Sequence, residues 1–245
     1  MDFYAVLSRY YDVVFPMGEP QRKFFHKLIE EKGITSVLDM ACGTGTYTLE
    51  LASQGIRALG IDLSQEMIDL AREKAAQQES RAEFQVGDML ALSPTVGTFD
   101  LVMCIGNSLV HLLSPEAIGQ ALEGFTQVLN PQGTLVLQIV NYDRVLDQHL
   151  PGLPVISRPQ VPLTFERNYH YRADGLLDFE SVLTVGEDSW RSSVPLLPLR
   201  REQLEQLVQA AGLTVTGVYG DFHGNPVNDQ SQPLVLVAQK GCGEG

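Results

Sequence analysis

The stretch from Val37 to Ala52, VLDMACGTGTYTLELA, constrains the fold of this chain more than any other. It begins at the end of an apolar run, which Asp39 follows, and Gly43 and Gly45 then mark a tight turn. From Thr46 onward, apolar residues recur at the spacing of one helix face. The stretch therefore predicts a buried strand, a glycine turn and a helix. Glycines let a ligand approach the backbone, and the first N–H groups of the helix are free to bind a negative group.

This turn is compatible with more than one class of protein. The dinucleotide-binding fingerprint needs a third glycine three residues after the second, and Thr48 occupies that position. The run DMACGTG instead resembles the first motif of class I S-adenosylmethionine (SAM) methyltransferases. That resemblance implies that Asp39, Ala41, Gly43 and Gly45 contact the cofactor. A purely structural glycine turn in a doubly wound fold is the third interpretation.

Composition limits the partners of this protein. A chain of 245 residues, 44% of them hydrophobic, is long enough for one large domain or one domain with an insertion. Its formal net charge is −13, whereas a protein that binds a polyanion should carry a basic face. We therefore expect a small-molecule substrate and neither a nucleic acid nor a membrane as partner.

Cysteine usage and the N-terminus favour a cytoplasmic protein. The three cysteines, Cys42, Cys104 and Cys242, are widely separated, which fits a reducing compartment and shows no metal-ligand spacing. We therefore expect no metal in the site. No apolar run is long enough to span a membrane, and the N-terminus lacks the features of a signal peptide.

A second buried strand, from Ile56 to Leu63, contains Asp62 near its tip. An acidic residue here, about 20 residues after the glycine turn, can accept hydrogen bonds from both ribose hydroxyls. A helix-capping aspartate is the alternative, but Ser64 already suits that role. The resemblance implies that Leu63 and Met67 also contact the cofactor.

A third strand, from Glu83 to Val86, leads into Gly87-Asp88-Met89. The resemblance implies that Asp88 accepts from the adenine amino group and that the N–H of Met89 serves a ring nitrogen. A turn aspartate is the alternative interpretation of Asp88.

The fourth strand, from Phe99 to Ile105, ends in small and polar residues at the edge where open α/β sheets bind ligands. The run CIGNSLVHL resembles the fourth motif of glycine and glycine/sarcosine N-methyltransferases. It implies that Ile105 and Gly106 contact SAM and that Asn107 contacts substrate. We consider His111 a candidate catalytic residue, although a capping or core histidine is the alternative.

The fifth strand, from Gly133 to Val140, follows a turn at 131–133 and runs into Asn141-Tyr-Asp-Arg-Val-Leu. This run also resembles the glycine N-methyltransferases, and the resemblance implies that Asn141 reaches the substrate's carboxylate. Asn141 is therefore a candidate catalytic residue, with a helix N-cap as the alternative.

The pattern changes after the fifth strand. Residues 150–162 contain several prolines and are expected to be irregular. The segments 163–172, 176–185 and 189–197 alternate apolar and polar residues and are separated by turn residues. They predict an antiparallel three-strand insertion. It lies where the methyltransferases that this chain resembles place a substrate lid, so the resemblance implies that role. Its candidate substrate-binding residues are Arg167, Tyr169 and Arg172, although only one face of the sheet can look inward.

We expect a helical arm or lid at 1–34, a SAM-binding core at 35–149, the β insertion at 150–199, a closing helix and hairpin at 200–240, and a tail at 241–245. In the arm, Tyr10-Tyr11-Asp12 resembles the Tyr-Asp segment of small-molecule methyltransferases, which makes Tyr11 a candidate catalytic residue. The arginine with which the glycine/sarcosine group meets the methionine carboxylate is replaced by Met17, and Arg22 is displaced.

The whole chain thus resembles a class I SAM-dependent methyltransferase. This implies an α/β fold with a doubly wound, seven-stranded, mostly parallel sheet of Rossmann-like type, followed after its fifth strand by the antiparallel three-strand insertion. We expect N-methylation of a small amine or amino acid. O-methylation of a small natural product and non-catalytic binding of SAM or a nucleoside are the alternatives, and a homodimer is possible.

Overall fold

The structure, a computed structural model, describes residues 3–241. The remainder of the predicted tail, with Cys242, lies outside the described residues. The helices are α1 (Phe3–Val14), α2 (Glu19–Lys32), α3 (Thr46–Ser53), α4 (Gln65–Gln77), α5 (Pro115–Val128), α6 (Tyr142–Asp147) and α7 (Arg201–Ala210), with 3-10 turns η1 (Met89–Ala91), η2 (Pro94–Val96) and η3 (Leu109–His111).

The main sheet has seven strands in the order β10-β11-β5-β4-β1-β2-β3. Their bounds are β1 (Ser36–Met40), β2 (Arg57–Asp62), β3 (Glu83–Val86), β4 (Phe99–Cys104), β5 (Leu129–Val140), β10 (Leu213–Tyr219) and β11 (Pro233–Lys240). The strands from β5 to β3 pair in parallel, and β11 is antiparallel to both of its neighbours. The predicted Rossmann-like fold class is confirmed.

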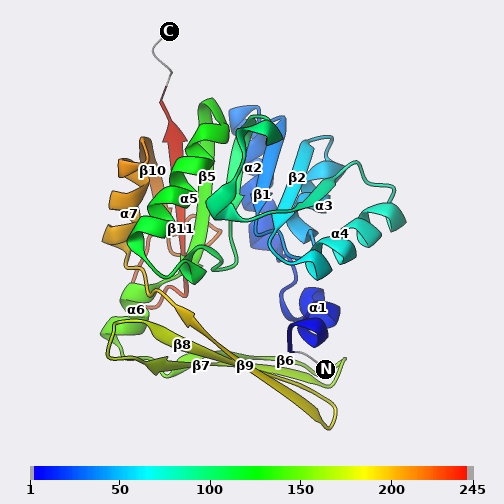
Figure 1. The fold of residues 1–245 in the computed structure, drawn as a ribbon, viewed down its shortest axis with the longest axis vertical. Helices are drawn as coiled ribbons and strands as arrows, with labels where there is room; N and C mark the ends of the chain where they lie inside the picture. The colour runs from blue at the N-terminus through cyan, green and yellow to red at the C-terminus, as the bar shows by residue number, and fades with distance from the viewer. Residues whose placement is uncertain (1–2, 242–245) are drawn as a thin grey trace.

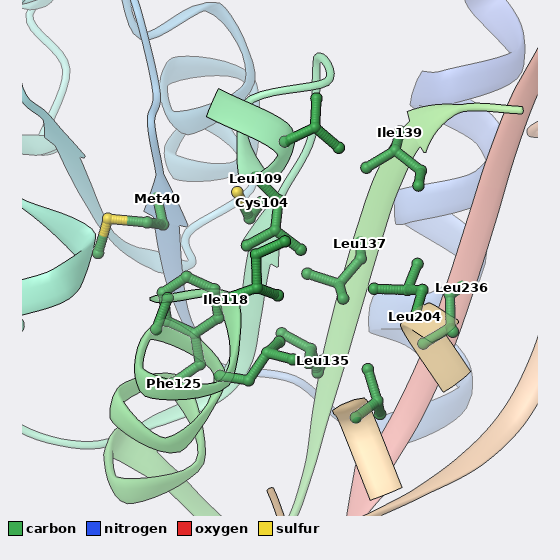
Figure 2. Packing of buried hydrophobic residues seen from close by; sticks show 14 of the residues in the cluster. Met40, Cys104, Leu109, Ile118, Phe125, Leu135, Leu137, Ile139, Leu204 and Leu236 are labelled. Atoms are coloured by element: carbon green, nitrogen blue, oxygen red, sulfur yellow. The ribbon is translucent and has the colours of Figure 1, made fainter. Parts of the chain in front are cut away.

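Helices cover both faces of this sheet because side chains of each strand alternate between them. Leu38 and Val102 face α5 and α7, whereas Val37 and Leu101 face α2 and α3. Figure 2 shows the first of these interfaces, where Ile118 and Phe125 of α5 pack near Leu135 of β5. All of these side chains are fully buried.

The fifth strand is longer than the sequence indicates. The predicted turn at 131–133 lies inside β5, which pairs with β4 through a register shift between Phe99 and Leu101. Gln132 adopts a positive φ of 64°, so the chain bends there without leaving the strand.

The insertion has four strands, so the prediction of three was wrong. Its order is β6 (Gly152–Arg158), β7 (Leu163–Tyr171), β8 (Leu177–Val185) and β9 (Asp188–Leu196). The extra strand, β6, lies in the segment expected to be irregular. It pairs only with β7, and the register shifts between Leu153 and Ile156, on either side of Pro154. Proline is tolerated at such an edge irregularity because no ladder hydrogen bond is needed there.

The four-stranded sheet lies across the carboxyl ends of the parallel strands, and α1 lies between it and the rest of the fold (Figure 1). α1 contacts β6 and β9 on one side and α4 on the other. Its apolar residues Phe3, Val6 and Leu7 share a buried cluster with Phe165 and Leu183 of the sheet. Within residues 3–241, no helix is both long enough and apolar enough to cross a membrane.

The interface between α5 and the sheet gives a stability prediction. Phe125→Ala should lower the free energy of unfolding by about 3–5 kcal/mol, because a fully buried aromatic ring leaves a cavity when removed. Urea unfolding measures the change. Phe24→Ala, at a partly exposed position of α2, is the control and should cost clearly less. Equal losses in both variants would contradict this packing.

Candidate active site

The site lies at the carboxyl ends of β1 and β4, where the order of the main sheet reverses. Open α/β sheets bind ligands at this switch point. A cavity of about 580 Å³ opens there, enclosed by the strand tips, α1 and the inner face of the four-stranded sheet. Among the predicted site residues, its wall includes Tyr11, Asp39, Ala41, Met67, Ile105, Gly106, Asn107, His111 and Arg167.

The glycine turn fits closely between its neighbours. Gly45 caps α3 with a φ of +75°, and a Cβ there would lie 2.5 Å from the ring of Phe84 on β3. At Gly43, whose φ is +55°, a Cβ would lie 3.1 Å from the Tyr11 ring. The turn therefore requires glycine both for its backbone conformation and for space.

Asp62 ties the glycine turn to the tip of β2. One carboxylate oxygen accepts from the N–H of Gly43 at 2.8 Å, and the other accepts from the N–H of Ser64 at 2.9 Å. Each oxygen keeps a second lone pair, so the carboxylate can still accept from a ligand diol. The next residue, Leu63, is 71% exposed and offers an apolar surface that a flat ring can cover.

Asp88 lies on the neighbouring strand tip, outside the main cavity. Its side chain caps η1 by accepting from the N–H of Leu90 at 2.9 Å. It lines a second hollow of about 270 Å³ beside β3. The side chain of Met89 packs against the main core rather than into this hollow.

Asp39 is the buried acid of the cavity. It is 2% exposed and accepts from the Thr48 hydroxyl at 2.7 Å. Burial raises the pKa of Asp39 to about 7; the Thr48 hydrogen bond opposes this rise and the nearby Asp62 adds to it. The charge of Asp39 therefore changes near neutral pH.

The N-terminal helix is fixed to the glycine turn through Asp12. Its carboxylate accepts from the hydroxyls of Thr44 at 2.6 Å and Thr46 at 2.8 Å, and it pairs with Lys74 of α4 at 2.7 Å. Burial opposes ionisation of Asp12, but the bonds from Lys74 and both threonines outweigh it and lower its pKa. These contacts hold the adjacent Tyr11 against Gly43. Burial raises the pKa of Tyr11, with Asp62 and Asp39 adding to the effect, so its hydroxyl stays protonated.

The fourth-strand motif forms the other wall of the cavity. Asn107, with a φ of +70°, accepts from the N–H of Val140 at 2.8 Å and donates to the Tyr142 hydroxyl at 3.0 Å. Gln138 accepts from the N–H of Gly106 at 2.8 Å. His111 is open to the cavity, and desolvation by the protein around it lowers the pKa of its imidazole. The ring is therefore neutral near pH 7.

Three of the catalytic and substrate-binding candidates do not reach the cavity. Asn141 is 3% exposed; it accepts from the N–H of Arg144 and donates to the carbonyl of Ser231, so it serves as the N-cap of α6. Tyr169 is buried against Phe179. Arg172 lies at an exposed hairpin, where it pairs with Asp174 at 2.6 Å.

Other cavity residues were not singled out from the sequence. Arg158 donates to the carbonyls of Val13 and Val14 at the end of α1. Gln138, Ser181, Ser192 and Phe222 also line the cavity. The alternation of the insertion's strands could have indicated that Ser181 and Ser192 face inward. No local pattern in the sequence indicates the position of Arg158. Met17 packs in an apolar cluster, and Arg22 pairs with Glu50 at 3.0 Å, so neither supplies a cation to the cavity.

Comparison with known proteins identifies the family. Residues 37–133 match a family model described as a methyltransferase domain. The chain is 35% identical over 224 residues to a glycine/sarcosine N-methyltransferase from Parasynechococcus marenigrum, covering 91% of this chain and 78% of that protein. The chain belongs to the S-adenosylmethionine-dependent methyltransferase family.

Further comparisons agree with this assignment. A glycine/sarcosine N-methyltransferase from Aphanothece halophytica is 28% identical over 227 residues, covering 89% of this chain and 81% of that protein. The fold superposes on a SAM-dependent methyltransferase from Clostridium acetobutylicum with a TM-score of 0.83 and 19% identity, covering 97% of this chain and 99% of that one. The predicted family, enzyme class and cofactor are confirmed.

The residues of this methyltransferase fit SAM. Asp62 keeps acceptor sites for a ribose diol, and the exposed Leu63 offers a surface for adenine. The Tyr11 ring packs against Gly43, so the glycine turn has no room for a side chain at that point. The roles of individual residues, including Asp88, Met67 and Ile105, remain predictions. In the described part of the chain, no three His, Cys, Asp or Glu side chains are grouped as metal ligands, and the expectation of a metal-free site also remains a prediction.

Asp62→Ala should weaken SAM binding about ten- to a hundredfold, because hydrogen bonds to a charged group are worth roughly 1.5–3 kcal/mol. Calorimetric titration of the folded variant measures this. Asp69→Ala, at an exposed position of α4, is the matched control and should bind as the wild type does. Unchanged affinity in Asp62→Ala would remove the ribose role from this residue.

SAM affinity should also depend on pH through Asp39. SAM carries a net positive charge, and the ionised form of Asp39 attracts it more than the neutral form does. Because the pKa of Asp39 is about 7, lowering the pH from 8 to 6 should protonate it and weaken binding by up to about tenfold. Asp39→Asn is neutral throughout and should bind weakly with a flatter pH profile. The same slope in both proteins would show that another group is responsible.

Proposed function

We propose that this enzyme transfers a methyl group from SAM to the nitrogen of a small amine that carries a carboxylate. The proposal rests on the surroundings of Arg167. Its guanidinium lines the cavity and forms no ion pair with any residue from 3 to 241. One Nη donates to the carbonyl of Pro154 at 2.6 Å, and the buried Nε has no acceptor. Desolvation lowers the pKa of Arg167, but the group stays charged at neutral pH.

A partly buried cation without an anionic partner is unfavourable, and a carboxylate is the ligand that guanidinium groups bind with two parallel hydrogen bonds. Such binding would orient the acceptor as well as hold it. The relatives named as glycine/sarcosine N-methyltransferases support an amino-acid acceptor. Arg167 takes over the carboxylate role that we first considered for Asn141, whose amide is engaged at the N-cap of α6.

The main task of the protein in this reaction is to align the acceptor with the methyl group of SAM. SAM supplies a methyl group already activated on a sulfonium, so alignment provides much of the rate, on the order of 7–11 kcal/mol in favourable cases. An amine can accept the methyl group only when it has lost its proton. The neutral His111 at the cavity wall can accept a proton from the acceptor.

In this proposal, different segments of the chain bind the cofactor and the acceptor. Residues 35–149 hold the cofactor, and α1 and the insertion at 150–199 enclose the acceptor. Cytoplasmic location, a homodimer and the lack of a nucleic-acid or membrane partner remain predictions from composition.

Arg167→Ala should raise the KM for an amino-acid acceptor about ten- to a hundredfold and change SAM affinity little, because it removes a charged contact to the acceptor alone. Steady-state assays with glycine, sarcosine and a panel of other amines measure this. Arg191→Ala is the matched control, since Arg191 pairs with Glu180 at 2.9 Å on an exposed part of the same sheet.

The rate with the wild type should rise with pH as the acceptor's ammonium deprotonates. Turnover of alcohols or phenols with none of any amine would overturn N-methylation and support O-methylation. Turnover of amines that is equally fast with and without a carboxylate would retain N-methylation and remove the role of Arg167.

A further inference from the structure

The inner face of the four-stranded sheet carries a row of polar side chains. Arg167 of β7 lies directly opposite Ser181 of β8, and Ser181 lies opposite Ser192 of β9. All three side chains line the cavity. A guanidinium and two hydroxyls therefore follow one another across three neighbouring strands.

This polar row is bordered by apolar rows on both sides. On one side, Phe165, Leu183 and Trp190 are opposite one another and pack beneath α1. On the other side lie Tyr169, Phe179 and Val194. The Tyr169 hydroxyl is buried and does not line the cavity, so hydrogen bonds from the central part of this face to a ligand come from the polar row.

The two serine hydroxyls have no hydrogen-bond partner among residues 3–241. Ser181 is only 7% exposed. Neither hydroxyl forms a hydrogen bond with another described residue. Ser192 is partly exposed, and neither hydroxyl is fully enclosed by the protein. Both hydroxyls therefore face the cavity and are free to bond a ligand or water there.

The length of the row sets the size of a ligand that could use all of it. Neighbouring strands lie about 4.8 Å apart, so the row from β7 to β9 spans roughly 10 Å. The guanidinium of Arg167 donates to Pro154 on β6, the side away from Ser181, which separates the charge further from the hydroxyls. Glycine is too short for its carboxylate to bind Arg167 while another of its polar groups reaches Ser192.

The β9 end of the row is also the end nearest the fourth-strand motif. Leu197, which follows β9, donates its N–H to the carbonyl of Val110 at 2.9 Å, next to His111. The row thus extends from the guanidinium at one side of the cavity toward the wall that contains the imidazole.

We infer that the acceptor carries, in addition to its amine and carboxylate, a further hydrogen-bonding group such as a hydroxyl, which Ser181 and Ser192 recognise. The inference rests on the proposed function for the amine and carboxylate. According to this inference, the two serines determine which amino acid is the acceptor. Amino acids with a further polar group are then better acceptors than glycine.

Calorimetry of acceptor binding to the enzyme saturated with S-adenosylhomocysteine tests this inference without turnover. The probes are matched pairs of amino acids in which a terminal hydroxyl replaces a terminal methyl group: serine with 2-aminobutyrate, homoserine with norvaline, and 5-hydroxynorvaline with norleucine. At one or more chain lengths, the hydroxyl member should bind about tenfold more tightly. The double variant Ser181→Ala/Ser192→Ala should lose this preference.

Ser193→Ala is the control, because Ser193 is the exposed neighbour of Ser192 on the same strand and does not line the cavity. It should keep the wild-type preference. The inference would be overturned by any of three results. These are equal affinities within every pair, no binding by any probe, and a preference that persists in the double variant. The wild type alone could prefer hydroxyl probes in calorimetry and yet methylate no amine in turnover assays. That result would reject the proposed N-methylation but retain the recognition of the hydroxyl by the serines.

Discussion

The glycine turn between β1 and α3 is the constraint on which the rest of the site depends. Because Gly45 has no side chain, α3 can begin directly beside Phe84, and α3 in turn presents Thr46 to the N-terminal helix. Because Gly43 has none either, its N–H bonds Asp62 on one side while the Tyr11 ring packs on the other. One short turn thus sets the relative positions of two strand tips and two helices.

Opposite this turn, the acceptor wall comes from a part of the chain with a different construction. The four-stranded sheet has its own alternating pattern and contributes side chains to the cavity. In the proposed function, one wall faces a constant cofactor and the other chooses an acceptor. Side chains such as Arg167 can be exchanged without moving the backbone around the cofactor.

The sequence predicted the main sheet well because its signals are local. Apolar runs that end in Asp39 and Asp62 mark strand tips, and parallel strands bring those tips to one edge. The insertion was predicted less well, because Pro154 conceals an edge strand whose partner is β7. A proline in the sequence indicates only that its own backbone cannot donate a hydrogen bond. It does not indicate whether the surrounding residues pair with a neighbouring strand.

Side-chain direction was the least predictable property. Asn141 and Asn107 both follow strands and both looked available, yet the first turns toward Ser231 and the second toward Val140 and Tyr142. The N-cap role of Asn141 is local and was the alternative given from the sequence, but the partners Ser231, Val140 and Tyr142 are distant in sequence from the asparagines that they bind. The same holds for Asp12, whose partner Lys74 is 62 residues away.

The contact between Arg158 and the end of α1 has a consequence for how the protein folds. Its hydrogen bonds to Val13 and Val14 join positions 145 and 144 residues apart. Asp12 of α1 can bind Thr44, Thr46 and Lys74 early, but the contact with Arg158 forms only after the central strands have been synthesised. Contacts of such long range slow folding, because the chain must close a large loop before they form. Until then the nascent protein has a cofactor wall but no enclosed cavity.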